Sequence, residues 1–546
     1  MSVSWLCSAS SVPSTTLSVV SLLATGALLA ACSSSSGSSS SESSDDIPPS
    51  SAAPGNPATV VAQPLSANAV DDAVAKLDGL VHSTMDATGI PGMAVAVVHG
   101  GKAVYAKGFG VAEVGTDRKV DADTVFPLAS MSKSIGATVV AKEITDKSVA
   151  WDTPVVANLP GFALSDPWVT RNVTIGDMYA HRSGLPDHAG DKLEDMGYGR
   201  DDVLARLRFM PLDPFRSTYH YTNFGVTAGA ESVARKAGTD WETLSQNTIY
   251  GPLGMTRTSS RFSDFESRSD RVVGHVKSGG KWVKTPAQRD PDAQAPAGGI
   301  SSSVNDVTHW LEMVLADGKY QGRQIVDADA LTSAVTPQII SSPAGSPEAR
   351  AGAYGFGFNV GVTASGRTTY SHAGAFAMGA ATDFMVLPSA DVAIVVLSNA
   401  APVGAVDAVA AEFVDIVQFG HVREDWRMLY GNAYASMDKP SGSLVGQKPP
   451  SNPAPAQPLS AYTGTYVNTV YGPAEVREQN GKLVLAMGPG GVTQHELTHW
   501  DGNTYTFTLR NENAEKGSVS KVTFNGGRMD IEYYQDDVSD GVFIRQ

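Results

Sequence analysis

The sequence predicts an α+β domain built on one antiparallel sheet, followed by a smaller all-β domain. Strand patterns occur near residue 100 and return near residue 390, whereas the stretch between them is helical in character. Strands from both ends of such a segment can join in a single antiparallel sheet. Residues 459–546 instead contain short alternating strands broken by glycine turns, which predicts a barrel or sandwich.

The N-terminal segment predicts export. Residues 17–31 form an apolar run that is too short to cross a bilayer comfortably and is typical of a signal peptide. The run ends in Leu-Ala-Ala-Cys32, which resembles a bacterial lipobox, where the cysteine is lipidated. We therefore expect a signal peptide at 1–31 and a membrane-anchored lipoprotein, periplasmic or at the cell surface. Because residues 1–16 contain no Lys or Arg, simple secretion and an uncleaved hydrophobic N-terminus are the alternatives.

Two segments of biased composition separate the predicted domains. Residues 32–68 are rich in Ser, Pro and Ala, cannot bury a core, and are predicted to form a tether. Residues 438–458 are rich in Pro and are predicted to be an interdomain linker. The α+β domain is accordingly expected at 69–437 and the β domain at 459–546.

Periodicity places the main elements of the larger domain. Apolar residues recur at helical spacing from Ala69, which predicts a helix of about five turns. The turn His99-Gly100-Gly101 between two strand patterns is typical of a hairpin. The predicted elements are strands at 93–98 and 103–108, a helix at 306–315, and strands at 354–360, 380–387 and 392–397.

Composition argues against several functions. The formal net charge of −16 and the lack of clustered Lys or Arg argue against nucleic-acid binding. Cys7 and Cys32 are both N-terminal, so the rest of the chain has no thiol for a disulfide or a metal. His495 and His499 match the zinc-protease pattern, but in a strand they would lie roughly 13 Å apart. No metal and no cofactor are expected.

One serine is placed to act as a nucleophile. An apolar helix is predicted to begin at about Ser130, so that Ser130 and Lys133 lie one turn apart on the same face. Burial lowers the pKa of an ammonium group, and the neutral amine can then accept the proton of the serine hydroxyl. The Ser-x-x-Lys spacing recurs elsewhere in the chain, so this pattern needs further context.

Two later motifs supply that context. Tyr221 and Asn223 form a Tyr-x-Asn motif, and His372 and Gly374 form a His-x-Gly motif directly before two predicted strands. Each motif also occurs elsewhere in the chain, so the evidence lies in their order and surroundings. With Ser130, they indicate acyl transfer, which needs an activated hydroxyl and donors for the developing oxyanion.

Residues 69–437 resemble the serine β-lactamase and D,D-peptidase superfamily, and within it the class C-like esterases and D-amino-acid peptidases. Besides the three motifs, the matching segments are VTIGDM at 173–178, HRSGL at 181–185, PLGM at 252–255, PAGGISS at 296–302 and YGFGF at 354–358. This resemblance implies an antiparallel sheet flanked by helices and an all-helical subdomain. Residues 462–466, 471–472 and 499–500 resemble the lipocalin-like C-terminal domain of some serine peptidases, which would assist oligomerisation or shape access to the site.

On these residues the resemblance implies an acyl-enzyme mechanism. Ser130 would attack the carbonyl, Lys133 would take its proton, and Tyr221 would be the general acid and later activate water. Asn223 would hydrogen-bond the substrate amide. The N–H groups of Ser130 and Ala375 would form the oxyanion hole, and the strand edge beginning at Ala375 would hold an extended substrate.

His372 departs from the β-lactamase pattern, which has lysine at this position. A mostly neutral imidazole would bind a substrate carboxylate less well than an ammonium group, which favours esters, amides or peptides over β-lactams. If His372 binds that carboxylate, activity on carboxylated substrates should rise as the pH falls toward 6. The alternative is a structural histidine at a strand end.

The predicted function is therefore that of a serine hydrolase that cleaves peptide or amide bonds, D-amino-acid-containing ones foremost, or esters. A short-chain carboxylesterase and a weak class C β-lactamase are alternatives, as is an inactive lipoprotein that binds cell-wall peptides. The expected partners are a small peptide, ester or β-lactam substrate, peptidoglycan fragments, the membrane through a lipid on Cys32, and further copies in a homo-oligomer.

Overall fold

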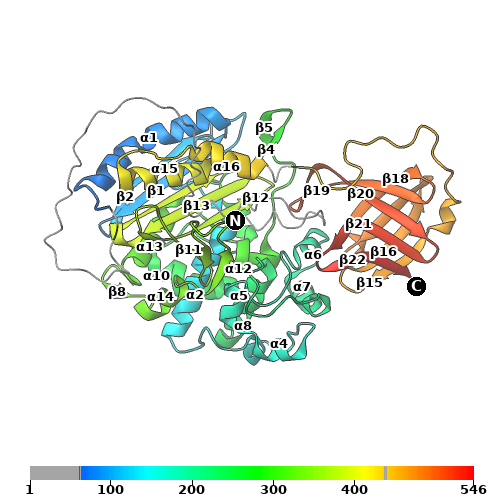
Figure 1. The fold of residues 1–546 in the computed structure, drawn as a ribbon, viewed down its shortest axis with the longest axis horizontal. Coiled ribbons are helices and arrows are strands. Elements are labelled where there is room, and N and C mark those ends of the chain that lie inside the picture. Colours follow the sequence, from blue (N-terminus) through cyan, green and yellow to red (C-terminus); the bar gives the residue numbers. More distant parts are fainter. Residues whose placement is uncertain (1–60, 62, 436–438) are drawn as a thin grey trace.

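The computed structural model describes residue 61 and residues 63–435 and 439–546, and it has two parts, a sheet-and-helix part and a C-terminal barrel (Figure 1). The predicted signal peptide, Cys32 and most of the tether lie outside these described residues. Within the described part of the chain, no helix combines the length and the apolar character that a membrane span requires.

One eight-stranded sheet joins the two ends of the larger part. Its strand order is β2-β1-β14-β13-β12-β11-β10-β9, and every neighbouring pair is antiparallel. The early strand β1 pairs with the late strand β14, with Met93 opposite Ser398, which confirms the predicted α+β sheet. The strands are β1 (Gly92–His99), β2 (Lys102–Gly110), β9 (Ile339–Ser342), β10 (Gly352–Tyr354), β11 (Asn359–Val362), β12 (Thr368–Phe376), β13 (Ala380–Leu387) and β14 (Val392–Ser398).

Helices bury both faces of this sheet (Figure 1). Along β1, Val95 and Val97 belong to the hydrophobic cluster of α1 and α15, whereas Ala94 and Ala96 belong to that of α2 and α13. Successive strand residues point to opposite faces, so a strand covered on both sides reads as a continuous apolar run. The covering helices are α1 (Ala69–Thr88), α2 (Ser132–Thr145), α13 (Val304–Leu315), α14 (Ala328–Ala334), α15 (Ala405–Phe419) and α16 (Trp426–Ala435).

The strand predicted at 354–360 is wrong as a single element. β10 ends at Tyr354 and β11 begins at Asn359, because the residues between them turn through Gly357, whose φ of +80° is a left-handed conformation. A Cβ on Gly357 would come within 2.6 Å of the Lys133 carbonyl oxygen. The turn therefore packs directly against the start of α2.

The middle of the chain forms the predicted helical subdomain. A capping box starts α5, with the Thr174 side chain and Asp177 each bonded to the other's backbone N–H. Asp177 also pairs with Arg182 and Arg216, which ties down the loops that lead to the next helices. The helices are α3 (Val155–Asn158), α4 (Pro167–Asn172), α5 (Ile175–Tyr179), α6 (Asp191–Asp195), α7 (Arg200–Arg206), α8 (Asn223–Ala237), α9 (Trp241–Ser245), α10 (Gly251–Leu253), α11 (Phe262–Ser267) and α12 (Ala295–Gly298).

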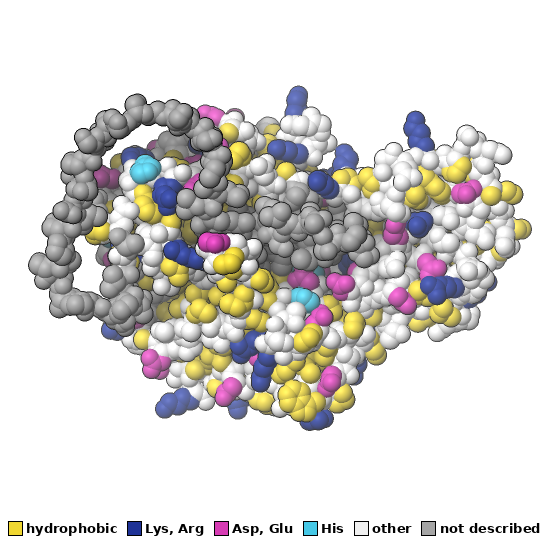
Figure 2. Space-filling model, viewed as in Figure 1, with side chains coloured by type: hydrophobic (Ala, Val, Ile, Leu, Met, Phe, Trp, Pro, Cys, Tyr) yellow, Lys and Arg dark blue, Asp and Glu magenta, His cyan; other side chains and the backbone are white. Residues whose placement is uncertain are grey.

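Short two-stranded ribbons complete this part of the molecule. They pair β3 (Phe126–Pro127) with β6 (Ser301–Ser302), β4 (His275–Ser278) with β5 (Lys281–Lys284), and β7 (Lys319–Tyr320) with β8 (Arg323–Gln324). Over the face seen in Figure 2, Lys and Arg side chains are scattered and do not gather in one patch.

The C-terminal part is a closed eight-stranded antiparallel barrel, which confirms the predicted lipocalin-like fold. Alternate residues of β17 fill its interior, with Leu483, Leu485 and Met487 buried. His495 and His499 both lie on β18, and no group of His, Cys, Asp or Glu in the described chain is arranged to hold a metal ion. The strands are β15 (Gly464–Asn468), β16 (Gly472–Gln479), β17 (Lys482–Met487), β18 (Thr493–Asp501), β19 (Thr504–Asn511), β20 (Ala514–Asn525), β21 (Arg528–Asp536) and β22 (Ser539–Arg545).

The barrel packs on the helical subdomain around α6 and α7 (Figure 1). Apolar residues of both parts form one continuous hydrophobic cluster. Polar contacts cross the same boundary, because Lys192 Nζ donates to Asp536 Oδ2 at 2.7 Å and the Tyr198 hydroxyl donates to the Tyr471 carbonyl at 3.1 Å. The two parts are therefore joined by a common hydrophobic core as well as by the linker.

Candidate active site

The predicted nucleophile lies where a tight turn enters a buried helix. Ser130 belongs to the 3-10 turn Ala129–Met131, which leads directly into α2, and its exposed fraction is only 8%. Ala129 has a φ of +47°, a left-handed conformation that is strained for a residue with a side chain. The residue directly before Ser130 is thus held in a strained backbone conformation.

Lys133 lies one turn after Ser130 and is completely buried. Its Nζ donates to Ser130 Oγ at 3.1 Å, to Asn223 Oδ1 at 2.7 Å and to the Ala297 carbonyl at 2.9 Å. Burial lowers the pKa of Lys133 to about 7, although the charge of Asp191 opposes that shift. A substantial fraction of Lys133 is therefore neutral near pH 7 and can accept a proton from the serine.

Tyr221 lies on the other side of Lys133. Lys133 Nζ is 4.5 Å from the centre of the Tyr221 ring, and the tyrosine is fully buried. Burial raises the pKa of Tyr221 well above 10, and the neighbouring Ser130 hydroxyl opposes this shift. The phenol therefore stays protonated at neutral pH, as a general acid must be.

Asn223 links the lysine to a carboxylate that sequence reasoning missed. Its Oδ1 accepts from Lys133, and its Nδ2 donates to Asp191 Oδ2 at 2.8 Å. The side chain thus holds Lys133 in place, and its predicted contact with a substrate amide stays a prediction. Asp191 was absent from the three motifs, and the only signal in the sequence is the stretch DHAGD at 187–191, which lies within a longer charged segment.

Two histidines, also missed, support this arrangement. His188 Nδ1 lies 2.8 Å from Asp191 Oδ2, and although burial lowers it, the charges of Asp187 and Asp191 raise the pKa of His188 overall. His181 Nδ1 accepts the Thr222 N–H at 3.1 Å, and its ring lies 4.5 Å from the Tyr221 ring. These contacts help to orient Lys133, the predicted base, and Tyr221, the predicted acid.

The charge of Asp191 provides a test of this network. In Asp191→Asn, the opposing charge is lost and the pKa of Lys133 falls further, so the acid limb of the pH profile of kcat/KM should move to lower pH. We expect a fall of about 10-fold in kcat at the optimum, since Asn223 loses a charged partner. Asp202→Asn, at an exposed position of α7, is the control and should keep the profile of the unmodified protein.

His372 lies inside the protein. It is fully buried, and both ring nitrogens have partners within the protein. Its Nδ1 donates to the Ala373 carbonyl oxygen at 2.6 Å, and its Nε2 accepts a hydrogen bond from the Tyr354 hydroxyl at 2.8 Å. Burial lowers the pKa of His372 well below 6.5. Both ring nitrogens are therefore bonded within the protein, and the predicted contact of His372 with a substrate carboxylate stays a prediction.

A pH series tests whether His372 binds a substrate carboxylate. The ratio of kcat/KM for two p-nitrophenyl esters, one carboxylated and one neutral but otherwise matched, should stay flat from pH 6 to 8. Titration of Lys133 affects both esters and cancels in the ratio. A ratio that rises several-fold toward pH 6 would instead support a substrate-binding role for His372.

Gly374 brings β12 against the nucleophile. A Cβ on Gly374 would collide with the Leu128 carbonyl and the Thr382 hydroxyl and would come 2.9 Å from the Ser130 nitrogen. Glycine is therefore required by this close approach. Beyond Ser371, β12 pairs with β13 only, so one edge of the strand around Ala375 has no neighbouring strand. This open edge next to Ser130 is where the sequence predicts the second oxyanion donor.

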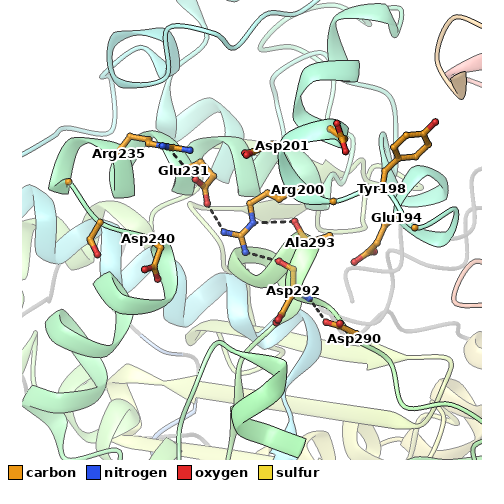
Figure 3. A pocket seen from close by; sticks show the side chains of 15 residues that line it. Glu194, Tyr198, Arg200, Asp201, Glu231, Arg235, Asp240, Asp290, Asp292 and Ala293 are labelled. Carbon is orange, nitrogen blue, oxygen red and sulfur yellow. Dashed lines mark hydrogen bonds and ion pairs between the residues drawn. The ribbon is translucent and has the colours of Figure 1, made fainter. Parts of the chain in front are cut away.

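A large cavity lies apart from these residues. It has a volume of about 1110 Å³ and is lined by the helical subdomain and residues 290–293, as Figure 3 shows. Arg200 crosses its wall and pairs with Glu231 at 2.6 Å, while Glu194 stands at one side. Neither Ser130, Lys133 nor Tyr221 lines this cavity, so we do not assign it to the candidate site.

Comparison with protein families and known proteins matches both parts of the chain. The family model described as Beta-lactamase matches residues 77–419, and one described as a domain of unknown function matches residues 448–532. The chain is 26% identical over 465 residues to unguisins hydrolase ungD of Aspergillus violaceofuscus, covering 77% of this chain and 80% of that protein. It is 30% identical over 236 residues to penicillin-binding protein 4 of Amycolatopsis lactamdurans, covering 42% of this chain and 60% of that protein.

A solved structure shares the fold. The octameric penicillin-binding protein homologue from Pyrococcus abyssi aligns with a TM-score of 0.56 at 18% sequence identity. The alignment covers 86% of this chain and 100% of that chain, and so includes the sheet-and-helix part and the barrel region together.

Proposed function

This chain belongs to the β-lactamase family of serine hydrolases, and on that premise we propose that it cleaves peptide or amide bonds, D-amino-acid-containing ones foremost, through an acyl-enzyme on Ser130. The observation that carries the proposal is the buried pair of Ser130 and Lys133. The lysine donates to the serine hydroxyl at 3.1 Å, and its pKa near 7 lets it exchange a proton with that hydroxyl at neutral pH.

The proposed reaction has two halves. Ser130 Oγ attacks the substrate carbonyl carbon while its proton passes to Lys133, and the oxyanion is stabilised by the N–H groups of Ser130 and Ala375. Tyr221 then protonates the leaving amine or alcohol as the bond to the carbonyl carbon breaks. In the second half, water gives a proton to the Tyr221 phenolate and attacks the acyl-enzyme carbonyl. The departing Ser130 Oγ takes back the proton held by Lys133, which releases the acid product and free Ser130.

The surroundings of His372 support peptides, amides and esters over β-lactams. A β-lactam carries a carboxylate that must be bound, and the lysine that the β-lactamase pattern places at this position is here a buried, neutral histidine. Substrates without a carboxylate near the scissile bond lose no binding interaction when lysine is replaced by histidine here. A short-chain ester is the second substrate class, since the same serine chemistry serves an alcohol leaving group.

A turnover panel tests the proposal. The purified protein is assayed with D-amino-acid amides and their L-enantiomers, p-nitrophenyl esters and a cephalosporin, and labelled in parallel with a fluorophosphonate. We expect labelling at Ser130 and the highest kcat/KM on the D-amino-acid amides. A cephalosporin turned over faster than the amides and esters would contradict the substrate proposal, and a protein that is not labelled would contradict the mechanism.

We further propose that the protein is exported, anchored through a lipid on Cys32, and oligomeric. The lipobox-like sequence supports the anchor, and the octameric state of the Pyrococcus abyssi homologue supports an oligomer. Metabolic labelling with a fatty acid should mark the protein and be lost in Cys32→Ser. Light scattering of the protein without its N-terminal segment should give a mass of at least two chains, and the mass of one chain would contradict the oligomer.

A further inference from the structure

A loop of the barrel reaches the strand that lies against the nucleophile. Glu512 stands between β19 and β20, which extend from the barrel toward the sheet domain (Figure 1). Its Oε1 accepts the Ala377 N–H at 2.8 Å and its Oε2 accepts the Met378 N–H at 3.4 Å. Ala377 and Met378 directly follow Phe376, the last residue of β12.

The turn that Glu512 holds leads straight to the candidate oxyanion position. Ala375 lies two residues before Ala377, on the part of β12 that pairs with a neighbouring strand on one side only. The turn also packs closely on residues 274–275, because a Cβ on Gly274 would come 2.6 Å from the Met378 carbonyl. The turn after β12 therefore contacts both its own domain and the barrel.

Buried charges surround this contact. Glu512 is only 6% exposed and lies near Arg289, which pairs with Glu194 at 2.6 Å and stacks over the Phe376 ring at 5.0 Å. Asp195, on the same side, accepts from Asn513 Nδ2 at 2.7 Å. Burial raises the pKa of Glu194 and of Glu512 to about 7 and that of Asp195 to about 6, with Arg289 opposing each shift.

Such a cluster is poorly explained by stability alone. Three carboxylates of low exposure lie near one guanidinium, which pairs with Glu194, and burying charged groups costs free energy that their pairing only partly offsets. An apolar contact would hold the two domains together without this desolvation free energy. A carboxylate at position 512 does something an apolar side chain cannot, because it accepts two adjacent backbone N–H groups and so sets the position of the turn.

We infer that the barrel completes the active site, and that Glu512 is a positioning residue which holds the turn after β12 and, through it, Ala375 beside Ser130. This inference rests on the acyl-transfer function proposed above, in which the Ala375 N–H stabilises the oxyanion. Displacement of such a donor by about 1 Å weakens transition-state stabilisation more than substrate binding, so the effect should appear in kcat.

The test compares Glu512→Ala, Glu512→Gln and Asn513→Ala in the full-length protein. Glu512→Ala should lower kcat by about 10- to 100-fold and change KM less than about threefold. Glu512→Gln should be intermediate, since its amide oxygen still accepts the Ala377 N–H while its NH₂ group faces the Met378 N–H. Asn513→Ala removes the neighbouring contact to Asp195 without touching the turn, and should keep kcat within about threefold.

Hydrogen exchange supplies a readout that does not depend on turnover. The N–H groups of Ala377 and Met378 should exchange faster in both Glu512 variants than in the unmodified protein and in Asn513→Ala. Unchanged exchange, a folded Glu512→Ala with kcat within twofold, or an equal loss of kcat in Asn513→Ala would each overturn the inference. If Glu512→Ala does not fold, the same measurements on Glu512→Gln decide. Absence of Ser130 labelling in the unmodified protein would contradict the proposed function and would leave the positioning role of Glu512 to be judged by hydrogen exchange.

Discussion

Replacing Ser130 by alanine is expected to lower kcat/KM on every substrate of the panel by about 10⁴-fold or more. The Lys133 amine is bonded to Ser130 Oγ, and its other two bonds are to the Asn223 side chain and the Ala297 carbonyl, so Ser130 supplies the hydroxyl that this base contacts. Fluorophosphonate labelling, read by mass spectrometry of the modified peptide, should be lost with the activity.

Ser278→Ala provides a matched control for this variant. Ser278 has the same Ser-x-x-Lys spacing, but it lies on the short hairpin strand β4 and its partner Lys281 lies across the turn on β5. This variant should keep full activity and labelling. Labelling that persists in Ser130→Ala and disappears in another serine variant would move the nucleophile elsewhere.

Replacing Lys133 by methionine should lower kcat/KM by about 10²- to 10⁴-fold, the usual contribution of a positioned general base. The pH profile of the unmodified protein gives a second measure of the same role. Burial lowers the pKa of Lys133 to about 7, so the lysine is protonated below that pH and cannot accept the serine proton. Activity should therefore rise as the pH increases through about 7 and level off above it.

Two further variants test the base assignment. Lys133→Arg keeps a positive charge that cannot be lost in this pH range, so it should be as inactive as Lys133→Met. Lys142→Met lies on the same helix, where the lysine pairs with Asp146 at the surface, and should keep both the activity and the profile. An active Lys133→Arg with an unchanged acid limb would show that another group is the base.

The elements found from the sequence were those with strong local periodicity. The helix from Ala69, the hairpin around His99 and the strands that lead to Leu397 depend on side-chain alternation that a short window contains. The strand predicted at 354–360 failed because its apolar residues belong to a turn. That turn exists because Gly357 packs on the backbone of α2, which is far away in the sequence.

The sequence alone determined the family, the α+β and barrel architecture, and the placing of Ser130 and Lys133 one helical turn apart, since that spacing follows from local helix geometry. Only the tertiary structure decided the surroundings of these groups. It buries Lys133, connects Asn223 to Asp191, encloses His372 against Tyr354, and brings Glu512 of the barrel to the end of β12. Burial and hydrogen bonds between distant segments depend on how whole elements pack. A pattern in the chain could therefore name the serine and the lysine, but it could not predict the burial of His372 or the contact of the barrel.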